Sequence, residues 1–172
     1  MKTFRAALIF LALFTLLTLS SCAQPITGAT REVLAADAYI AAEYDTVWSH
    51  FTDADAYAAW YSAPCRSFGA RAGQACEWAD DERVYYRGTV ESIEKGRGLR
   101  HTFQFAMFDF GEPPTPVDIE IIPSGETVLV RIRHDVTGAP QTRDVITDVG
   151  WQKSLSRLKT LLETGSPMPW PQ

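Results

Sequence analysis

The large apolar residues near the C-terminus repeat at the spacing of a helix. Steps of four, three and four residues separate Trp151, Leu155, Leu158 and Leu162. This spacing places the four side chains on one helical face, with Leu161 at the edge of that face. Such a helix needs an apolar surface to cover, and a curved sheet is the simplest one.

The ends of this helix carry their own signals. Asp144 or Asp148 can cap its start, and Gly165 followed by Pro167 can end it. We therefore predict one long helix over residues 144–165.

A different period governs the middle of the chain. Apolar and polar residues alternate there, which is typical of strands with one buried and one solvent-facing side. For example, Val128, Val130, Ile132 and His134 share one side of a strand. Six strands are predicted, at 65–69, 74–79, 83–94, 99–107, 117–123 and 127–136.

The segment before these strands is mixed. Residues 31–42 are predicted to form a first strand, followed by two short helices. Asp45 would cap the first helix, and Thr52 with Asp55 would form a capping box for the second, which ends near Pro64. This order predicts an α+β domain in which a seven-stranded antiparallel sheet wraps around one long C-terminal helix.

The N-terminus has the pattern of an export signal. Lys2 and Arg5 come before an uncharged apolar run that ends at Leu19. The run is shorter than the roughly 20 residues that a membrane-spanning helix needs. We therefore predict a secretory signal peptide over residues 1–21.

The end of this segment resembles the bacterial lipobox. The residues Leu19-Ser20-Ser21-Cys22 directly follow the apolar run. The resemblance implies cleavage before Cys22 and acylation of that cysteine, which would anchor the protein in a membrane. A plain signal peptide or an uncleaved anchor is the alternative. Ala23 after the cysteine favours the outer membrane, by resemblance to enterobacterial lipoprotein sorting.

The remaining chain divides into three parts. Residues 22–30 form a short polar tether, 31–165 the folded domain, and 166–172 a loose tail rich in proline. Removal of the leader would leave 14 basic against 21 acidic residues. This balance argues against nucleic acid or an anionic membrane face as a binding partner.

Two cysteines, Cys65 and Cys76, lie in the folded domain. A hairpin centred on Ala70-Arg71 would place them directly opposite each other. Export would bring them into an oxidising compartment, so we predict a disulfide, with two separate buried thiols as the alternative. A metal site is not expected, because neither cysteine has a second ligand at zinc spacing.

Several stretches of the chain resemble one known superfamily. Their order along residues 31–165 carries the likeness, which lies in Val47-Trp48, Phe51-Thr52-Asp53, Trp60-Tyr61, 87–94, 99–103 and Gly150-Trp151. The chain resembles the SRPBCC superfamily (START-like, or birch-pollen-allergen-like), and its branch related to the activator of the heat-shock-protein-90 ATPase. The resemblance implies a helix-grip fold with an apolar cavity between the sheet and the long helix. Members of this branch act with a cytosolic chaperone, and export would separate this protein from that compartment.

The residues that would line this cavity are mostly aromatic. Rings are common in any core, so core packing and contact with a flat apolar ligand are both open. His101 and His134 lie on inward sides of strands, where either could act as a general base or a hydrogen-bonding anchor. Glu77 or Asp109 could complete an acid–base pair, or could be solvated ends of strands and loops. The expected lining residues are Trp48, Trp60, Trp78, Tyr86, Phe103, Phe105, His134, Trp151 and Leu155.

Three functions fit this pattern. The first is binding of a small apolar molecule or lipid in the cavity. The second is catalysis of a cyclase or hydrolase type that uses His134, and the third is a chaperone-like interaction with a protein. No nucleotide, cofactor or metalloprotease motif is present in the sequence. A cavity too small for a metabolite would favour the third function.

Overall fold

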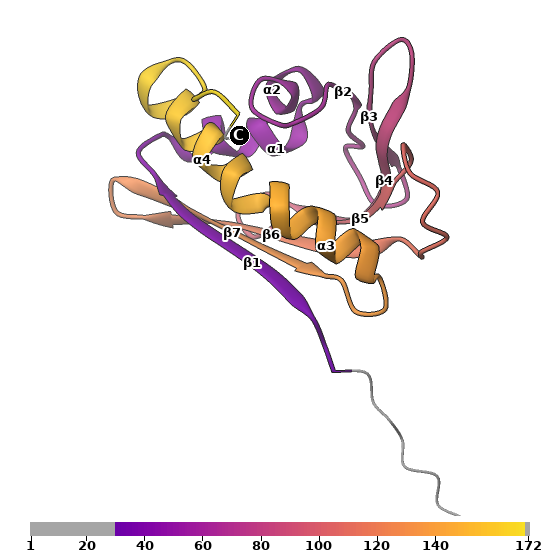
Figure 1. Ribbon diagram of the computed structural model, residues 1–172. Helices are drawn as coiled ribbons and strands as arrows, with labels where there is room; N and C mark the ends of the chain where they lie inside the picture. Colours follow the sequence, from indigo (N-terminus) through magenta and orange to yellow (C-terminus); the bar gives the residue numbers. More distant parts are fainter. Residues whose placement is uncertain (1–29, 171–172) are drawn as a thin grey trace, which may run out of the picture.

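Seven antiparallel strands form one continuous sheet, and all four helices lie on the same face of it (Figure 1). The computed structural model describes residues 30–170, so the predicted signal peptide, Cys22 and most of the tether lie outside the described residues. The α+β helix-grip architecture expected from the sequence is confirmed. The spatial order of the strands is β1-β7-β6-β5-β4-β3-β2. Their bounds are β1 Val33–Ile40, β2 Cys65–Ser67, β3 Ala75–Ala79, β4 Val84–Glu94, β5 Gly98–Phe105, β6 Thr115–Ser124 and β7 Thr127–Asp135.

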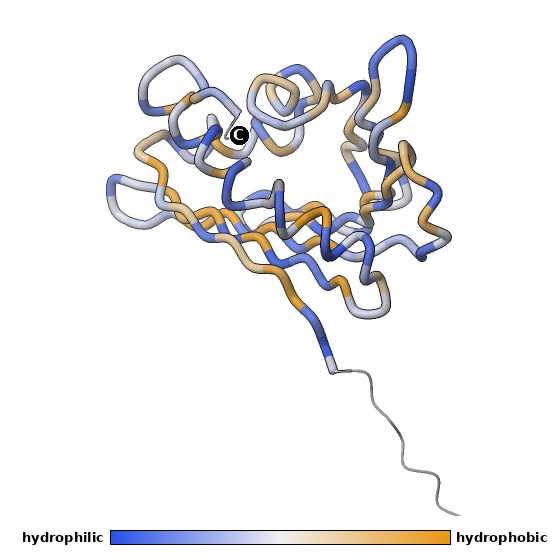
Figure 2. The backbone as a smooth tube through the Cα atoms, in the orientation of Figure 1, coloured by the Kyte–Doolittle hydropathy of each residue, from blue (hydrophilic) through white to orange (hydrophobic). Residues whose placement is uncertain are grey.

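Alternation along each strand decides which side chains enter the core. Along β7 the residues Val128, Val130, Ile132 and His134 are buried, whereas the arginines between them point to the outer face. Figure 2 shows this mixture of hydrophobic and hydrophilic residues along the sheet. The sheet therefore has one dry and one wet face, as its period of two predicts.

The C-terminal helical segment differs from the prediction of one helix. It consists of α3 (Pro140–Val149) and α4 (Trp151–Thr164), which are separated at Gly150. Pro140 is the first residue of α3, a position where its missing N–H costs nothing. Asp144 and Asp148 lie inside α3, so the prediction that one of them caps the helix is wrong. Gly165 does end α4, in the left-handed conformation with φ 82°.

Gly150 occupies a place that a larger residue would fill badly. A Cβ atom built there would lie 2.5 Å from the carbonyl oxygen of Ile146. The break turns the chain so that Trp151 enters the core, where only 4% of its surface is exposed. The apolar face of α4 is buried as predicted through Trp151, Leu155 and Leu158.

The two short helices exist, but other residues cap them. Asp45 lies in the first turn of α1 (Tyr44–Thr52) rather than at its cap. The side chain of Asp53 accepts from the backbone N–H of Ala56 and opens α2 (Ala54–Ala58). Thr52 instead donates to the carbonyl of Trp48 within α1, at 3.0 Å, so the predicted capping box with Asp55 is wrong.

The tail is held more closely than expected. Arg157 on α4 donates to the carbonyl of Met168, and its guanidinium lies 5.4 Å from the ring centre of Trp170. The same side chain donates to the carbonyl of Trp60 at 3.0 Å. Residues 166–170 therefore pack against α4. None of the helices within residues 30–170 is long and apolar enough to cross a membrane.

Candidate functional site

The space between sheet and helices is filled by a network of aromatic rings. Tyr61, which follows α2, stands at its centre. Its ring centre lies 5.3 Å from that of Tyr57, 5.5 Å from Trp60 and 5.7 Å from Trp151. Tyr61 also contacts Trp78 and Tyr86, each at 5.9 Å. Contacts at these distances contribute packing energy beyond the area that they bury.

Most of the residues predicted to line the cavity belong to this network. Phe103 and Phe105 extend it along β5 through Tyr86, at 5.2 and 5.3 Å. Leu155 is fully buried on the inner side of α4. Trp48 is the exception, because it stacks on Tyr44 at 6.3 Å, on α1. The buried rings of Tyr57 and Tyr61 and the half-buried ring of Phe68 were not predicted to line the interior; the spacing of four between the two tyrosines was the available signal.

Little free space remains between these rings. The opening into the interior is lined by Tyr61, Tyr86, Phe105, Ile146 and Trp151, among others, and has a volume of about 20 Å³. This volume holds about one water molecule. Ligand pockets typically measure about 300–1,000 Å³. In this conformation the protein's own aromatic side chains fill the space in which the helix-grip fold would hold a small molecule.

His134 is part of a closed hydrogen-bonded chain inside the core. The indole N–H of Trp151 donates to its Nδ1 at 3.1 Å, which makes Nε2 the protonated nitrogen. Nε2 then donates to the hydroxyl of Thr115 at 2.7 Å, and this hydroxyl donates to the carbonyl of Phe103 at 3.1 Å. The chain ties α4 to β5, β6 and β7.

Both the burial of His134 and the hydrogen bonds of its two ring nitrogens argue against a catalytic role. Its side chain is fully buried, and burial lowers its pKa to about 3, with a smaller lowering from nearby His101. Both ring nitrogens are occupied, so neither can reach a substrate without breaking the chain to Trp151 or Thr115. The geometry thus favours the second possibility for this residue, a hydrogen-bonding anchor.

His101 lies deeper in the aromatic half of the core. Its Nδ1 donates to the carbonyl of Thr102 at 2.8 Å, and burial lowers its pKa to about 4. Its Nε2 has no partner among the described residues. Trp78 and Phe68 surround the ring at 5.6 and 5.8 Å.

The two carboxylates considered as catalytic partners lie elsewhere. Glu77 forms an ion pair with Arg66 at 2.9 Å, and both side chains are partly exposed. Asp109 lies in the loop after β5 beside Phe108 and Phe110, next to a hollow of about 270 Å³. The structure therefore assembles no acid–base pair from Glu77 or Asp109 with either histidine.

The cysteines occur as free, buried thiols. The predicted placement is wrong in register, because Cys65 lies opposite Trp78 and the pairing of β2 shifts between Cys65 and Ser67. Cys76 lies two residues away along β3, which makes the cysteines diagonal rather than directly opposed neighbours. The predicted disulfide is accordingly not formed. Burial raises the pKa of both thiols to about 12, so neither is a ready nucleophile.

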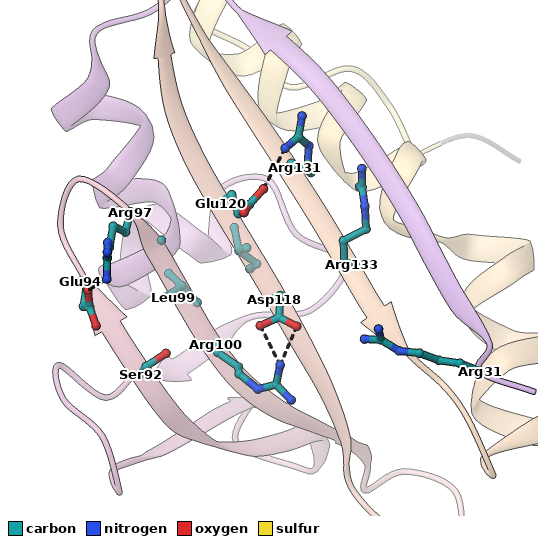
Figure 3. Close-up of a pocket in the computed structure, with 12 residues that line it drawn as sticks. Arg31, Ser92, Glu94, Arg97, Leu99, Arg100, Asp118, Glu120, Arg131 and Arg133 are labelled. Carbon is teal, nitrogen blue, oxygen red and sulfur yellow. Dashed lines mark hydrogen bonds and ion pairs between the residues drawn. The ribbon is translucent and has the colours of Figure 1, made fainter. Parts of the chain in front are cut away.

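A much larger hollow lies on the opposite, outer face of the sheet (Figure 3). It measures about 590 Å³ and is open to solvent. Figure 3 shows its side chains rising from neighbouring strands. The charged residues that line it are Arg31, Arg97, Arg100, Arg131 and Arg133 with Glu94, Asp118 and Glu120.

Ion pairs order this outer face across the strands. Arg100 on β5 binds Asp118 on β6 at 2.7 Å and Glu91 on β4 at 2.6 Å. Two similar ion pairs link β7 to its neighbours: Arg131 binds Glu120 on β6 at 3.0 Å, and Arg133 binds Asp37 on β1 at 2.5 Å. Opposite charges on adjacent strands favour the observed register.

The arginines at the rim are the most accessible. The side chains of Arg31 and Arg97 are 71% and 83% exposed. Each has one carboxylate partner, Asp135 and Glu94 respectively, and a guanidinium carries five donors. The rim can therefore bind further acceptors. Arg131 and Arg133 alternate with the inward residues of their strand, so an outward side follows for them, but no pattern in the sequence indicated a hollow shared by five arginines.

The fold and these sites place the protein in a known class. A sheet that grips one helix face, with two short helices after the first strand, defines the helix-grip domain of the SRPBCC superfamily. Residues 41–163 match the family model described as Activator of Hsp90 ATPase homolog 1-like protein. The match covers more than half of the chain, and the protein belongs to this family. A search of curated proteins finds no significant match.

Solved structures show the same fold at low sequence identity. DynU16, described as a putative protein in the dynemicin biosynthetic locus, is 20% identical with a TM-score of 0.65. The match covers 78% of this chain but only 48% of DynU16, so the chain spans about half of that protein. Protein MLL2253 from Mesorhizobium loti is 18% identical, with a TM-score of 0.65 over 77% of this chain and 97% of the other. The Aha1 dimer from Colwellia psychrerythraea is 14% identical, with a TM-score of 0.63 over 78% and 98%.

Proposed function

We propose that this protein is a lipid-anchored component of the bacterial envelope whose domain serves as a protein-interaction module. The observation that carries the proposal is the filled interior. The opening among the inner aromatic rings, beside Tyr61, Tyr86 and Trp151, measures only about 20 Å³, whereas the outer face holds a hollow of about 590 Å³. Recognition is therefore assigned to the outer face, and the interior is assigned to stability.

The charges of the outer hollow suggest the chemistry of its partner. Five arginines and three carboxylates line it, although the whole chain has a net charge of −5. Arginine is enriched in protein interfaces, because its planar fork binds carboxylates in two places and stacks on flat groups. We infer a partner segment with acidic side chains that bind the rim arginines Arg31 and Arg97. The name of the family, an activator of a chaperone ATPase, agrees with an interaction role.

The location is a separate part of the proposal. The lipobox-like residues ending at Cys22 support an envelope protein whose tether holds the domain near a membrane, with the outer membrane favoured by Ala23. Labelling with palmitate should mark the protein, and Cys22→Ala should abolish the label. A fully soluble, unlabelled protein would refute the anchor and leave the interaction role to be tested by itself.

Binding of a small apolar molecule remains a second candidate because of one feature. The helix break at Gly150 lies at the opening between Tyr61, Tyr86 and Trp151. Movement of α3 about this break would widen the opening toward the aromatic rings. Native mass spectrometry of the purified protein tests this candidate, since a stoichiometric apolar molecule would support it and an empty spectrum would favour the first proposal.

The interaction role is tested by photocrosslinking in cells that make the protein. A photoreactive residue replaces Ser92, which lines the outer hollow, and in a matched control it replaces the exposed Arg71 of the β2–β3 connection. We expect a discrete crosslinked protein from position 92, and its loss when Arg31→Glu and Arg97→Glu are added. Equal crosslinking from positions 92 and 71 would overturn the assignment of partner binding to the outer face.

A further inference from the structure

The two edges of the sheet differ in how well they are protected. The edge strand β2 has three residues, and its pairing with β3 is irregular. Arg66 crosses this edge by binding Glu77 and the carbonyl of Asp80. The other edge strand, β1, has eight residues and pairs with β7 without any shift in register. Short or irregular edges resist pairing with other chains, whereas long flat edges invite it.

The free backbone groups of β1 can be identified from its pairing. The N–H of Val136 donates to the carbonyl of Glu32 at 2.9 Å, so even-numbered residues of this strand bond to β7. The odd-numbered residues therefore direct their N–H and C=O groups away from the sheet. These residues are Val33, Ala35, Asp37 and Tyr39.

Within residues 30–170, the contacts to this edge come from the end of α4. Lys159 donates to the carbonyl of Tyr39 at 2.6 Å, and the N–H of Ala41 donates to Glu163 at 2.8 Å. These two hydrogen bonds involve only the C-terminal end of β1. The carbonyl of Tyr39 keeps a second lone pair for another donor.

The side chains on the outer side of β1 are unusually apolar for an edge. Val33 is 38% exposed and Tyr39 is 57% exposed, and they are among the four large apolar residues that the structure exposes within its described part. The one charge between them, on Asp37, is bound by Arg133. No lysine or proline interrupts the strand.

We propose that β1 pairs in antiparallel fashion with β1 of a second copy of this chain, which joins two sheets into one. Val33 then lies opposite Tyr39 of the second copy, and Ala35 lies opposite its Asp37. All four outward residues of each strand find partners, in about eight hydrogen bonds. A β-branched residue opposite an aromatic one is a favourable pair, and no like charges meet.

A second copy fits this edge better than an unrelated strand for two reasons. Val33 and Tyr39 are equally distant from Ala36, so a two-fold axis there pairs both exposed side chains at once. The assembly also stops at two copies, because the β1 edges are then paired with each other and only the two protected β2 edges remain. A groove of about 190 Å³ runs beside the edge between Leu34, Ala35 and the helix break at Gly150, and it leaves room for side chains of the added strand. Figure 1 shows β1 at the free margin of the sheet.

Sedimentation velocity of the full-length protein in detergent tests the dimer over a range of concentrations. Ala35→Pro removes an outward N–H without removing a bond to β7, and we expect it to weaken the dimer at least about tenfold. Ala35→Ser is the matched control, because it keeps the N–H and should dimerise normally. Tyr39→Lys, which places a repelling charge at the edge, should weaken the dimer independently.

Cysteine crosslinking tests the register. A mixture of Val33→Cys and Tyr39→Cys proteins should form a crosslinked dimer under mild oxidation, while neither variant alone should do so. A protein that stays monomeric at all concentrations would overturn the proposal. A dimer that Ala35→Pro and Tyr39→Lys leave intact would overturn it equally, as would binding of this edge to a different protein in preference to a second copy.

Discussion

The two faces of the sheet differ in how far their side chains are exposed to water. On the inner face, Phe103 and His134 have at most 1% of their surface exposed, and every polar atom of His134 is bound. On the outer face, Arg100 and Arg133 keep 35–40% of their side chains exposed although each is ion-paired. Neighbouring residues on one strand thus belong to two different environments.

The difference agrees with the proposed division, in which the inner face provides stability and the outer face provides recognition. Buried rings gain from dispersion and from the removal of apolar surface from water, so the inner face should dominate the free energy of unfolding. Exposed ion pairs are screened by water and typically contribute 0–1 kcal/mol each, so the outer face can be changed at little cost. A face that can change freely is suited to binding different partners. Four substitutions test this division.

The largest effect is expected at Trp151, where the inner face meets the helix break. Trp151→Ala removes the stacking on Tyr61 and leaves a cavity, so we expect the free energy of unfolding to fall by about 3–5 kcal/mol. Urea titration followed by circular dichroism measures it. Trp151→Phe keeps a ring but loses the N–H to His134, and should cost less. Equal losses for both variants would show that the hydrogen bond, rather than the packing, sustains the inner face.

Acid should weaken the inner face before it affects the outer one. The folded-state pKa values of His134 and His101 are lowered to about 3 and about 4 by burial, against about 6.5 in the unfolded chain. The unfolded state then binds more protons, so stability is complete above pH 6.5 and is lost as the pH falls toward the folded pKa values. Each histidine should contribute up to about 1.4 kcal/mol per pH unit between pH 5.5 and 4.5.

A single replacement separates the contributions of the two histidines to the pH dependence of stability. His134→Gln should remove about half of the slope, measured by urea unfolding at a series of pH values. Asp135, whose pKa is lowered to about 2 mainly by hydrogen bonds from Thr137 and Arg31, loses its contribution only below about pH 4. A wild-type stability that is flat between pH 6.5 and 4.5 would contradict the burial of both rings.

Much of the fold follows from periodicity alone. The period of two between residues 65 and 136 predicts the strands that the structure contains, and the apolar face of Trp151, Leu155 and Leu158 predicts the packing of α4. The break at Gly150 was not predicted, because the apolar spacing begins only after it and the polar residues before it also suit a helix. Pro140 was the local signal for the true start.

The site was harder to predict than the fold. Alternation indicated that His134 faces inward, but its bonds to Thr115 and Trp151 depend on the pairing of three distant segments. Whether inward rings enclose a cavity or fill it depends on their rotamers and on Tyr61, and the sequence specifies neither. The diagonal placement of the cysteines arises from an irregular pairing of β2 that no turn residue indicated.

A smaller effect is expected where the loop before β6 holds α3. The carboxylate of Glu112 accepts from the backbone N–H groups of Gln141 and Thr142 at 2.7 and 2.9 Å. Burial is the largest single influence on its pKa and raises it, but the hydrogen bonds from Gln141 and Thr142 together outweigh burial and lower the pKa. Glu112→Ala should cost about 1 kcal/mol, because it leaves two N–H groups at the first turn without an acceptor.

The control for this residue is Glu126, an exposed glutamate. Glu126 lies in the turn between β6 and β7, where it caps no helix. Glu126→Ala therefore removes the same charge without affecting a helix end. It should leave the unfolding curve unchanged. Hydrogen exchange of the α3 amides should increase in Glu112→Ala alone, and unchanged exchange would show that α3 is held by Ile146 rather than by this carboxylate.

The smallest effect is expected at Arg100, the best-connected residue of the outer face. It binds Asp118 and Glu91 from two neighbouring strands, and these hydrogen bonds raise its pKa further above the usual value. Because its side chain is 40% exposed, water screens both pairs, and Arg100→Ala should cost no more than about 1 kcal/mol. A double-mutant cycle with Asp118→Ala isolates the pair, and a coupling energy well above 1 kcal/mol would mean that the outer face also holds the fold together. If the coupling is small, the arginines of this face are free to exchange their carboxylates for those of a partner, as the interaction role requires.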